Sequence, residues 1–175
     1  MSRWVALRPT SICWKDRTIS ALFVLMLLYV ALVTLAAAQD VATLRISNVL
    51  SVSVLVVAIA ALIIAWPGNW WEHLAGFGIV LAVGILLFSQ GWMGGGDVKL
   101  FAAAALAFNF DGLLRFLPAA LISGGLIAAV MLFSRMFLPA REGPRKWRQV
   151  PYGVAIAIGA IAICFFYPAG SAFAQ

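Results

Sequence analysis

Charged residues are scarce in this sequence, and acidic residues are the scarcest. Only 10% of the 175 residues are charged, with 12 Lys or Arg against 6 Asp or Glu, whereas a soluble domain carries roughly 25% charged residues. The single histidine and two cysteines do not have the spacing of a zinc site or a disulfide framework. The composition therefore excludes an ordinary soluble domain, and we expect neither a metal nor another cofactor.

Long apolar runs take the place of charge. Hydrophobic residues make up 65% of the sequence, and about 20 apolar residues suffice to span a bilayer. The fourth run is short and rich in alanine, so we expect it to pack against neighbouring helices; the others are long enough to cross. We predict an all-α, polytopic membrane helix bundle of about six transmembrane helices, built as a single domain over residues 1–175. The runs cover residues 19–38, 49–66, 73–90, 98–110, 113–138 and 151–168.

The net charge of +6 is interpreted as a topology signal and not as a nucleic-acid surface, because the basic residues flank the apolar runs. With six crossings the side that collects more basic residues should be cytosolic, which places the amino terminus outside. The basic segment 134–151 faces the cytosol and lipid headgroups in this arrangement. One side collects seven basic residues, Arg45, Lys99, Arg135, Arg141, Arg145, Lys146 and Arg148, and the other five, Arg3, Arg8, Lys15, Arg17 and Arg115.

The first apolar run allows an alternative interpretation. Its basic start and the small residues Ala36 and Ala38 also match a secretory signal peptide with its cleavage site. The run is longer than the apolar part of a typical signal peptide, which favours a spanning helix.

Two of the six acidic residues lie where an apolar run meets the membrane surface. Asp40 follows the first run and Asp97 precedes the fourth, and the two crossings between them return the chain to the same side. Ionisable groups at this depth are costly unless they are paired or functional, so Asp40 and Asp97 are the candidate catalytic pair. The alternative is structural: Asp97 would be the N-cap of the fourth helix, and Asp40 a residue that ends the first.

Three glycines precede the second of these acids, in the stretch GGGDVKL. Gly94, Gly95 and Gly96 remove side chains where another chain must approach the backbone closely. An extended peptide at membrane depth needs partners for its amide groups, and exposed backbone supplies them. Two neighbouring carboxylates tend to share one proton, so one can activate water while the other donates to a peptide carbonyl. The pattern predicts peptide hydrolysis by a carboxylate pair.

The same residues resemble the type IV prepilin peptidases, membrane aspartic peptidases of the Gly-x-Gly-Asp class, and in particular the small branch of tight-adherence (Flp) pilus systems. The resemblance covers most of the chain and is carried by GGGDVKL, by QDVATLRISN after the first run and by VPYGVAIAIGA in the last. It implies that Asp40 and Asp97 are the catalytic pair, at the cytosolic face of the bacterial inner membrane. Ser47 departs from the family, which usually has proline there, and leaves the rigidity of that turn open.

The resemblance implies a substrate and partner, a prepilin or pilin-like membrane protein whose basic leader is cut after a glycine. Gly94, Gly95 and Gly96 would shape the substrate cleft, and Arg45, Asn48 and Lys99 are weaker candidates for binding substrate. Tyr152 and Gly153 are expected to be structural. Large family members carry a Cys-x-x-Cys insertion associated with N-methylation; this sequence has none, so we expect no methyltransferase activity.

Two alternatives to this function stay open. The protein could be a non-enzymatic membrane scaffold or transporter subunit, with Asp97 as a helix cap. It could also be an intramembrane aspartic protease of the presenilin type, although those carry a Tyr-Asp pair and here Gln39 precedes Asp40. The sequence does not indicate an oligomeric state.

Overall fold

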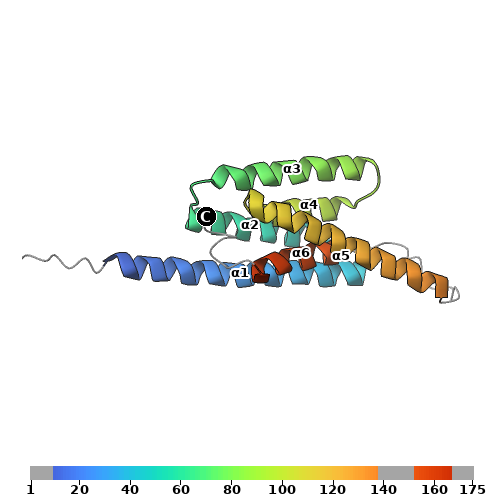
Figure 1. Cartoon of the computed structure of the whole chain (residues 1–175), viewed down its shortest axis with the longest axis horizontal. Coiled ribbons are helices and arrows are strands. Elements are labelled where there is room, and N and C mark those ends of the chain that lie inside the picture. The colour runs from blue at the N-terminus through green and yellow to red at the C-terminus, as the bar shows by residue number, and fades with distance from the viewer. Residues whose placement is uncertain (1–9, 138–151, 167–175) are drawn as a thin grey trace, which may run out of the picture.

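The computed structural model describes residues 10–137 and 152–166 of the chain. These residues form six helices and no strand (Figure 1). In chain order the helices are α1 (Thr10–Thr43), α2 (Asn48–Ala65), α3 (Trp70–Ser89), α4 (Gly95–Ala105), α5 (Phe110–Phe137) and α6 (Tyr152–Phe166).

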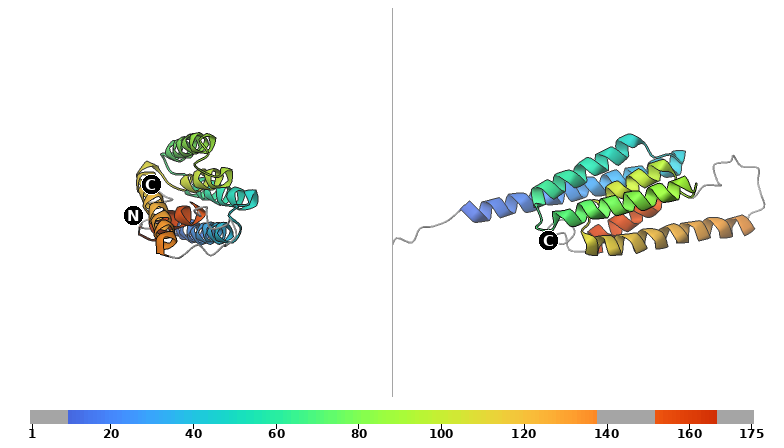
Figure 2. Two further views of the ribbon diagram at one scale, coloured as in Figure 1. Left: turned by 90° about the vertical axis from the view of Figure 1, so that its right-hand side faces the viewer. Right: turned by 90° about the horizontal axis from the view of Figure 1, so that it is seen from above.

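The helices lie side by side along one long axis, and α1 and α5 extend past the others in opposite directions (Figures 1 and 2). Successive helices run antiparallel, so their ends gather at two levels. We call the level where α1 and α3 end and α2, α4 and α6 begin the site end, and the level where α3 and α5 begin the far end. The main helix contacts join α6 to α1 and α5, α1 to α2, and α4 to α2 and α3.

Within the described residues, four helices are long and apolar enough to cross a membrane: Thr18–Thr43, Asn48–Ala65, Trp70–Ser89 and Phe110–Ser134. The prediction of an all-helical membrane bundle is therefore confirmed. The fourth apolar run is short, as predicted, because α4 has 11 residues. The sixth run was predicted to span but its helix has 15 described residues, fewer than a crossing needs.

The basic segment 134–151, on which the predicted orientation depends, lies mostly outside the described residues, as do Arg3 and Arg8. Six of the twelve basic residues behind the orientation prediction therefore lie outside the described residues.

The short helix α4 is largely enclosed by its neighbours. Its buried residues include the alanine run 102–105, and the turn that follows, as far as Phe108, is buried as well. Small side chains let neighbouring helices approach closely. Gly84 of α3 shows how closely, since a Cβ at this position would lie 2.6 Å from Cγ1 of Val98 on α4. The prediction that α4 packs within the bundle is confirmed.

A buried tyrosine joins α1 to α4. Tyr29 has no exposed surface, and its hydroxyl donates a hydrogen bond to the backbone oxygen of Ala104 at 3.1 Å. Its ring also contacts Phe108 in an edge-to-face arrangement. A phenol inside a membrane bundle needs such a partner, so this bond fixes the depth of α4 relative to α1.

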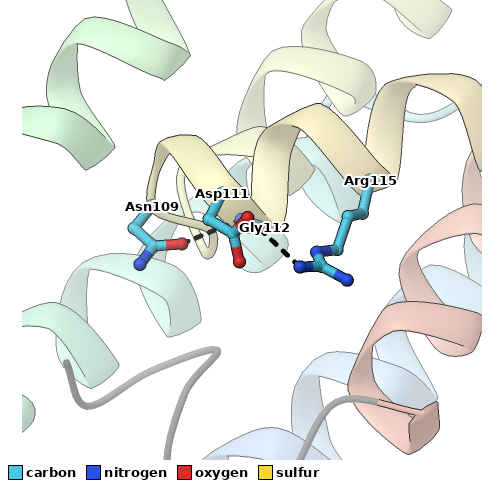
Figure 3. Close-up of polar contacts among 4 residues, drawn as sticks. All are labelled: Asn109, Asp111, Gly112 and Arg115. Carbon is cyan, nitrogen blue, oxygen red and sulfur yellow. Dashed lines mark hydrogen bonds and ion pairs between the residues drawn. The ribbon is translucent and has the colours of Figure 1, made fainter.

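At the far end, the start of α5 is held by side-chain caps. Asn109 accepts a hydrogen bond from the backbone nitrogen of Gly112 at 2.9 Å, and Asp111 and Arg115 form an exposed ion pair of 3.3 Å (Figure 3). Glu72, at the start of α3, accepts a bond from the backbone nitrogen of Phe110. Asparagine at this position satisfies a helix N–H that would otherwise lack a partner. Glu72 and Asp111 therefore serve the fold at the end of the bundle away from Asp40 and Asp97.

Candidate functional site

Asp40 lies in the last turn of α1, three residues before the helix ends at Thr43. It is 4% exposed, and its Oδ2 accepts a hydrogen bond of 2.7 Å from the backbone nitrogen of Gly153. Gly153 is in the first turn of α6, where the backbone N–H groups have no partner within the helix. A helix N-terminus favours negative charge, so α6 supplies both a hydrogen bond and a favourable dipole to this carboxylate.

Asp97 lies in the first turn of α4, but it is not the N-cap. Gly94 occupies the N-cap position, and the carboxylate of Asp97, three residues later, accepts a hydrogen bond from the backbone of Gly94. This is the reach-back half of a capping box. The alternative that Asp97 is the N-cap is therefore wrong, because the glycine takes the extended backbone conformation of that position.

Asp40 and Asp97 are close enough to interact electrostatically. Burial, followed by the charge of Asp40, raises the pKa of Asp97 from 3.8 to about 6, and the hydrogen bond from Gly94 opposes this rise. The chain returns to the site end through α2 and α3, as the number of crossings predicted. Two carboxylates in this relationship titrate as a coupled pair and hold one proton over part of the pH range.

Ile46, in the connection between α1 and α2, separates the helix starts that carry the site. A Cβ on Gly96 would lie 3.2 Å from the backbone oxygen of Ile46, and one on Gly153 would lie 3.1 Å from its Cδ1. Both glycines therefore allow close packing against this one residue, Gly96 mainly against its backbone and Gly153 against its side chain. Ile46 was not predicted as a site residue, since an apolar residue in a short connection carries no signal in the sequence.

The three glycines before Asp97 have different environments. Gly94 is exposed, and a Cβ there would lie 2.9 Å from Oδ2 of Asp97. Gly95 is partly covered by the ring of Phe88, and Gly96 by Ile46. Gly95 and Gly96 thus allow close packing, and Gly94 is the one whose backbone is exposed beside the carboxylate.

The three polar candidates lie at the same end of the bundle. Lys99 donates a hydrogen bond of 3.0 Å from Nζ to Oδ1 of Asn48, and both side chains are exposed. This bond joins α4 to the start of α2. The side chain of Arg45 is exposed in the α1–α2 connection, and among the described contacts none joins it to Asp40 or Asp97.

Ser47 caps α2 at the position where proline was expected. Its side chain accepts a bond from the backbone nitrogen of Val49 at 3.2 Å, and its own backbone nitrogen donates to Oε1 of Gln39 at 3.0 Å. Its φ of −65° is the value that a proline ring imposes. The turn after Asp40 is therefore held by two hydrogen bonds and needs no proline ring.

Comparison with known proteins gives one match. The sequence model of the type IV leader peptidase family matches residues 26–133, which is more than half of the chain and includes Asp40, Asp97 and the three glycines. No curated protein and no solved structure matches the chain.

Proposed function

Because the chain belongs to the type IV leader peptidase family, we propose that it is a membrane aspartic endopeptidase that removes the leader peptide of prepilins or pilin-like proteins. The observation that carries this proposal is the pairing of Asp40 with Asp97 at one end of the bundle, beside the exposed backbone of Gly94. The proposed chemistry uses the two carboxylates themselves.

In the proposed mechanism the pair holds one proton, on Asp97. Asp40 is the base: it takes a proton from a water molecule, whose oxygen attacks the peptide carbonyl carbon. Asp97 donates its proton to the carbonyl oxygen, which gives a neutral tetrahedral diol. As the diol collapses, the C–N bond breaks, Asp40 passes its proton to the leaving nitrogen, and Asp97 recovers a proton from a diol hydroxyl. The products are a new carboxyl group and a new amine, and the pair returns to its starting state.

The arrangement of the backbone supports each role. The Gly153 N–H bond and the start of α6 stabilise a charged Asp40, and partial burial beside another acid favours a protonated Asp97. Gly94 is exposed and has no side chain, so an extended substrate can lie against it, although its backbone already bonds the carboxylate of Asp97 and the nitrogen of Val98. Lys99 and Asn48 would bind polar groups of the substrate at the surface of the same end, with Arg45 nearby in the chain.

We extend the proposal to the branch of the family and to the range of activities of the protein. The chain acts as one membrane-embedded peptidase domain over residues 1–175, serves a Flp-type pilus and cleaves after glycine. It has no methyltransferase activity, since the sequence lacks the Cys-x-x-Cys insertion of the large members.

The proposed location is the bacterial inner membrane, with the site end at the cytosolic face. The excess of basic residues on that side supports this orientation. To test this orientation, cysteines are introduced at residues 45 and 92, and a labelling reagent is applied from each side of the membrane. We expect labelling from the cytosolic side. Labelling from the outside alone would show that the opposite orientation is correct.

The proposed function is tested by mass spectrometry of a candidate prepilin co-expressed with the wild type, Asp40→Ala or Asp97→Ala. The candidate is a membrane protein with a short basic leader, a glycine at the junction and an apolar helix after it. We expect only the wild type to release the leader, with all three proteins at equal levels in the membrane. Trimming by either variant would remove the carboxylate pair from the mechanism.

A further inference from the structure

Ser51 is the one polar side chain on the buried face of α2. It is 4% exposed, and it is followed on the same face by Val54, Ala58 and Ala61, which are almost completely buried. Its hydroxyl oxygen is buried and has no hydrogen-bond partner among the described residues. A buried hydroxyl without a partner is unfavourable, above all inside a membrane bundle, so this oxygen requires an explanation.

A serine or threonine within a helix commonly avoids this cost by bonding the preceding turn of its own helix. Thr43 of α1 and Ser123 of α5 both donate to the backbone oxygen four residues earlier, at 2.9 and 2.8 Å. The corresponding oxygen for Ser51 is that of Ser47. It accepts a bond of 3.3 Å from the backbone nitrogen of Ser51, but none from the hydroxyl. The hydroxyl is therefore available to a group outside α2.

Ser51 lies at the same height as Asp40. Asp40 is three residues before the end of α1, and Ser51 is three residues after the start of α2. The two helices are antiparallel neighbours joined by a short connection (Figure 1), across which the backbone nitrogen of Ser47 bonds Oε1 of Gln39. Equal distances from such a connection give equal heights, since both helices rise about 1.5 Å per residue.

Ser51 is also within one helical turn of the height of Asp97. Helices α2 and α4 are parallel neighbours, because both begin at the site end. Ala58 of α2 and Leu106, the C-cap of α4, border the same small gap. Two turns earlier on the two helices are Ser51 and Lys99, and Asp97 is two residues before Lys99. Side chains on a helix lean toward its N-terminus, so the Ser51 hydroxyl leans toward the site end.

Four charged side chains lie on α1, α4 and the α1–α2 connection at the site end. Lys99 and Arg45 are exposed, whereas Asp40 is buried and Asp97 is partly buried. The described residues of α6 add no charged side chain. The main contacts of α2 are with α1 and α4, so the helices that cover Ser51 are the two that carry the acids. The carboxylates are therefore the charged groups that can face the Ser51 hydroxyl inside the bundle.

We infer that Ser51 is a positioning residue of the carboxylate pair, whose hydroxyl donates a hydrogen bond toward the pair through a buried water molecule. A buried water is bound by roughly two to four polar groups, and the hydroxyl and the two carboxylates provide them. The bond comes from the α2 side and holds the carboxylates in the orientation that the reaction uses. The inference rests on the proposed function and adds an uncharged third group to the pair.

The test removes the hydroxyl and restores it. Ser51→Ala deletes the oxygen and leaves a small side chain, and Ser51→Thr retains a hydroxyl. Ser53→Ala is the matched control, because Ser53 is on the same helix but on a different face, and it is only partly buried. Initial rates of leader release are measured over a range of prepilin concentrations from pH 5 to 8, with unfolding midpoints on the same samples.

We expect Ser51→Ala to lower kcat about tenfold, as the loss of one hydrogen bond at the reacting groups allows, with KM unchanged. A hydrogen-bond donor favours the charged form of an acid. Its loss should therefore move the decline of the rate at high pH to a higher pH, by about half a unit or more. Ser51→Thr should restore both kcat and the pH profile, and Ser53→Ala should change neither.

Three results would overturn the role of the hydroxyl. Ser51→Ala could match Ser53→Ala in kcat and pH profile. It could also lose kcat without a shift of the profile, or to the same extent as Ser51→Thr, which would assign the loss to packing. Failure of Ser51→Ala to accumulate in the membrane would assign the hydroxyl to the fold. Absence of cleavage by the wild type would instead overturn the proposed function, and the inference with it.

Discussion

The backbone nitrogen of Gly153 donates a hydrogen bond of 2.7 Å to Oδ2 of Asp40, 113 residues earlier in the chain. This contact joins the end of α1 to the start of α6. It also explains the glycine: a Cβ at residue 153 would lie 2.9 Å from Oδ2 and 3.0 Å from Cβ of Asp40. A residue that the sequence suggested to be structural therefore contacts a proposed catalytic group directly.

Gly153→Ala should reduce leader cleavage by about 100-fold while the protein still folds. The new methyl group displaces Asp40 or α6 by a fraction of an ångström to an ångström, and a misplacement of this size can reduce a rate about 100-fold. The measurement is the rate of leader release by purified protein in micelles, with the thermal unfolding midpoint recorded on the same samples.

Gly125→Ala is the matched control, because Gly125 also lies in a helix and a Cβ there meets no atom within 4 Å. It should keep the wild-type rate and unfold at an equal or slightly higher temperature. Equal activity of Gly153→Ala and Gly125→Ala would show that the contact with Asp40 has no role in positioning it.

Asp97→Asn should abolish cleavage and leave stability at neutral pH equal or higher. The amide oxygen still accepts the hydrogen bond from Gly94, and the unfavourable burial of a second negative charge is removed. Because the pKa of Asp97 is raised from 3.8 to about 6 on folding, the folded wild type binds the extra proton. Its stability therefore declines as pH rises from about 4 to about 6.

The gain in stability of Asp97→Asn over the wild type should accordingly be largest above pH 6 and vanish near pH 4. Unfolding midpoints of wild type and variant at pH 4 and pH 7.5 measure it. A variant much less stable than wild type at both pH values would mean that the carboxylate is needed for the fold.

The rate of cleavage should fall as pH rises above about 6. The mechanism requires one proton on the pair, and the raised pKa of Asp97 sets where that proton is lost. Well above pH 6 the rate should drop about tenfold per pH unit. Initial rates on a single prepilin between pH 5 and 8 test this, with unfolding midpoints to separate loss of activity from loss of fold. A rate that is flat from pH 6 to 8 would contradict a shared proton.

The sequence was sufficient to predict the helices and the placement of Asp40 and Asp97 at one end, because both depend on simple patterns. Apolar length gave the number and class of the helices, and counting crossings placed Asp40 and Asp97 at the same end. Helix ends were less accurate: α1 was expected to end at residue 38, yet it continues to Thr43, so Asp40 lies inside its last turn. Helix α1 ends because Leu44 adopts a left-handed backbone conformation, with a φ of 53°. Leucine has no preference for this conformation, so the sequence does not signal the helix end.

The surroundings of the pair could not be predicted for a different reason. Ile46, Gln39 and Gly153 contribute through tertiary packing, and their residue types are common in connections and apolar helices. The departure at Ser47 left the rigidity of that turn open, because the sequence shows the missing proline and not the two hydrogen bonds that replace it.

Ser47→Ala should destabilise the protein by about 1 kcal/mol and leave the chemistry intact. The substitution removes the side-chain oxygen that accepts from the nitrogen of Val49, and loss of an N-cap typically costs about this much. Ser47→Asn retains a capping oxygen and serves as the control, with a stability close to wild type. The two variants should have different unfolding midpoints and the same cleavage rate. A large loss of cleavage rate in Ser47→Ala would place the serine in the active site.

Gly84→Ala should destabilise the protein through a steric clash between α3 and α4, and a shorter side chain at Val98 should relieve this clash. A Cβ at residue 84 would lie 2.6 Å from Cγ1 of Val98, the residue after Asp97, and overpacking of this kind typically costs 1–3 kcal/mol. Gly84→Ala with Val98→Ala should therefore be more stable than the sum of the single changes, as a double-mutant cycle of unfolding midpoints measures. Gly78→Ala, on the same helix with no atom within 4 Å, should be neutral or slightly stabilising. Additive effects of the two substitutions would mean that α4 shifts freely against α3, and Asp97 would then have no fixed position beside Asp40.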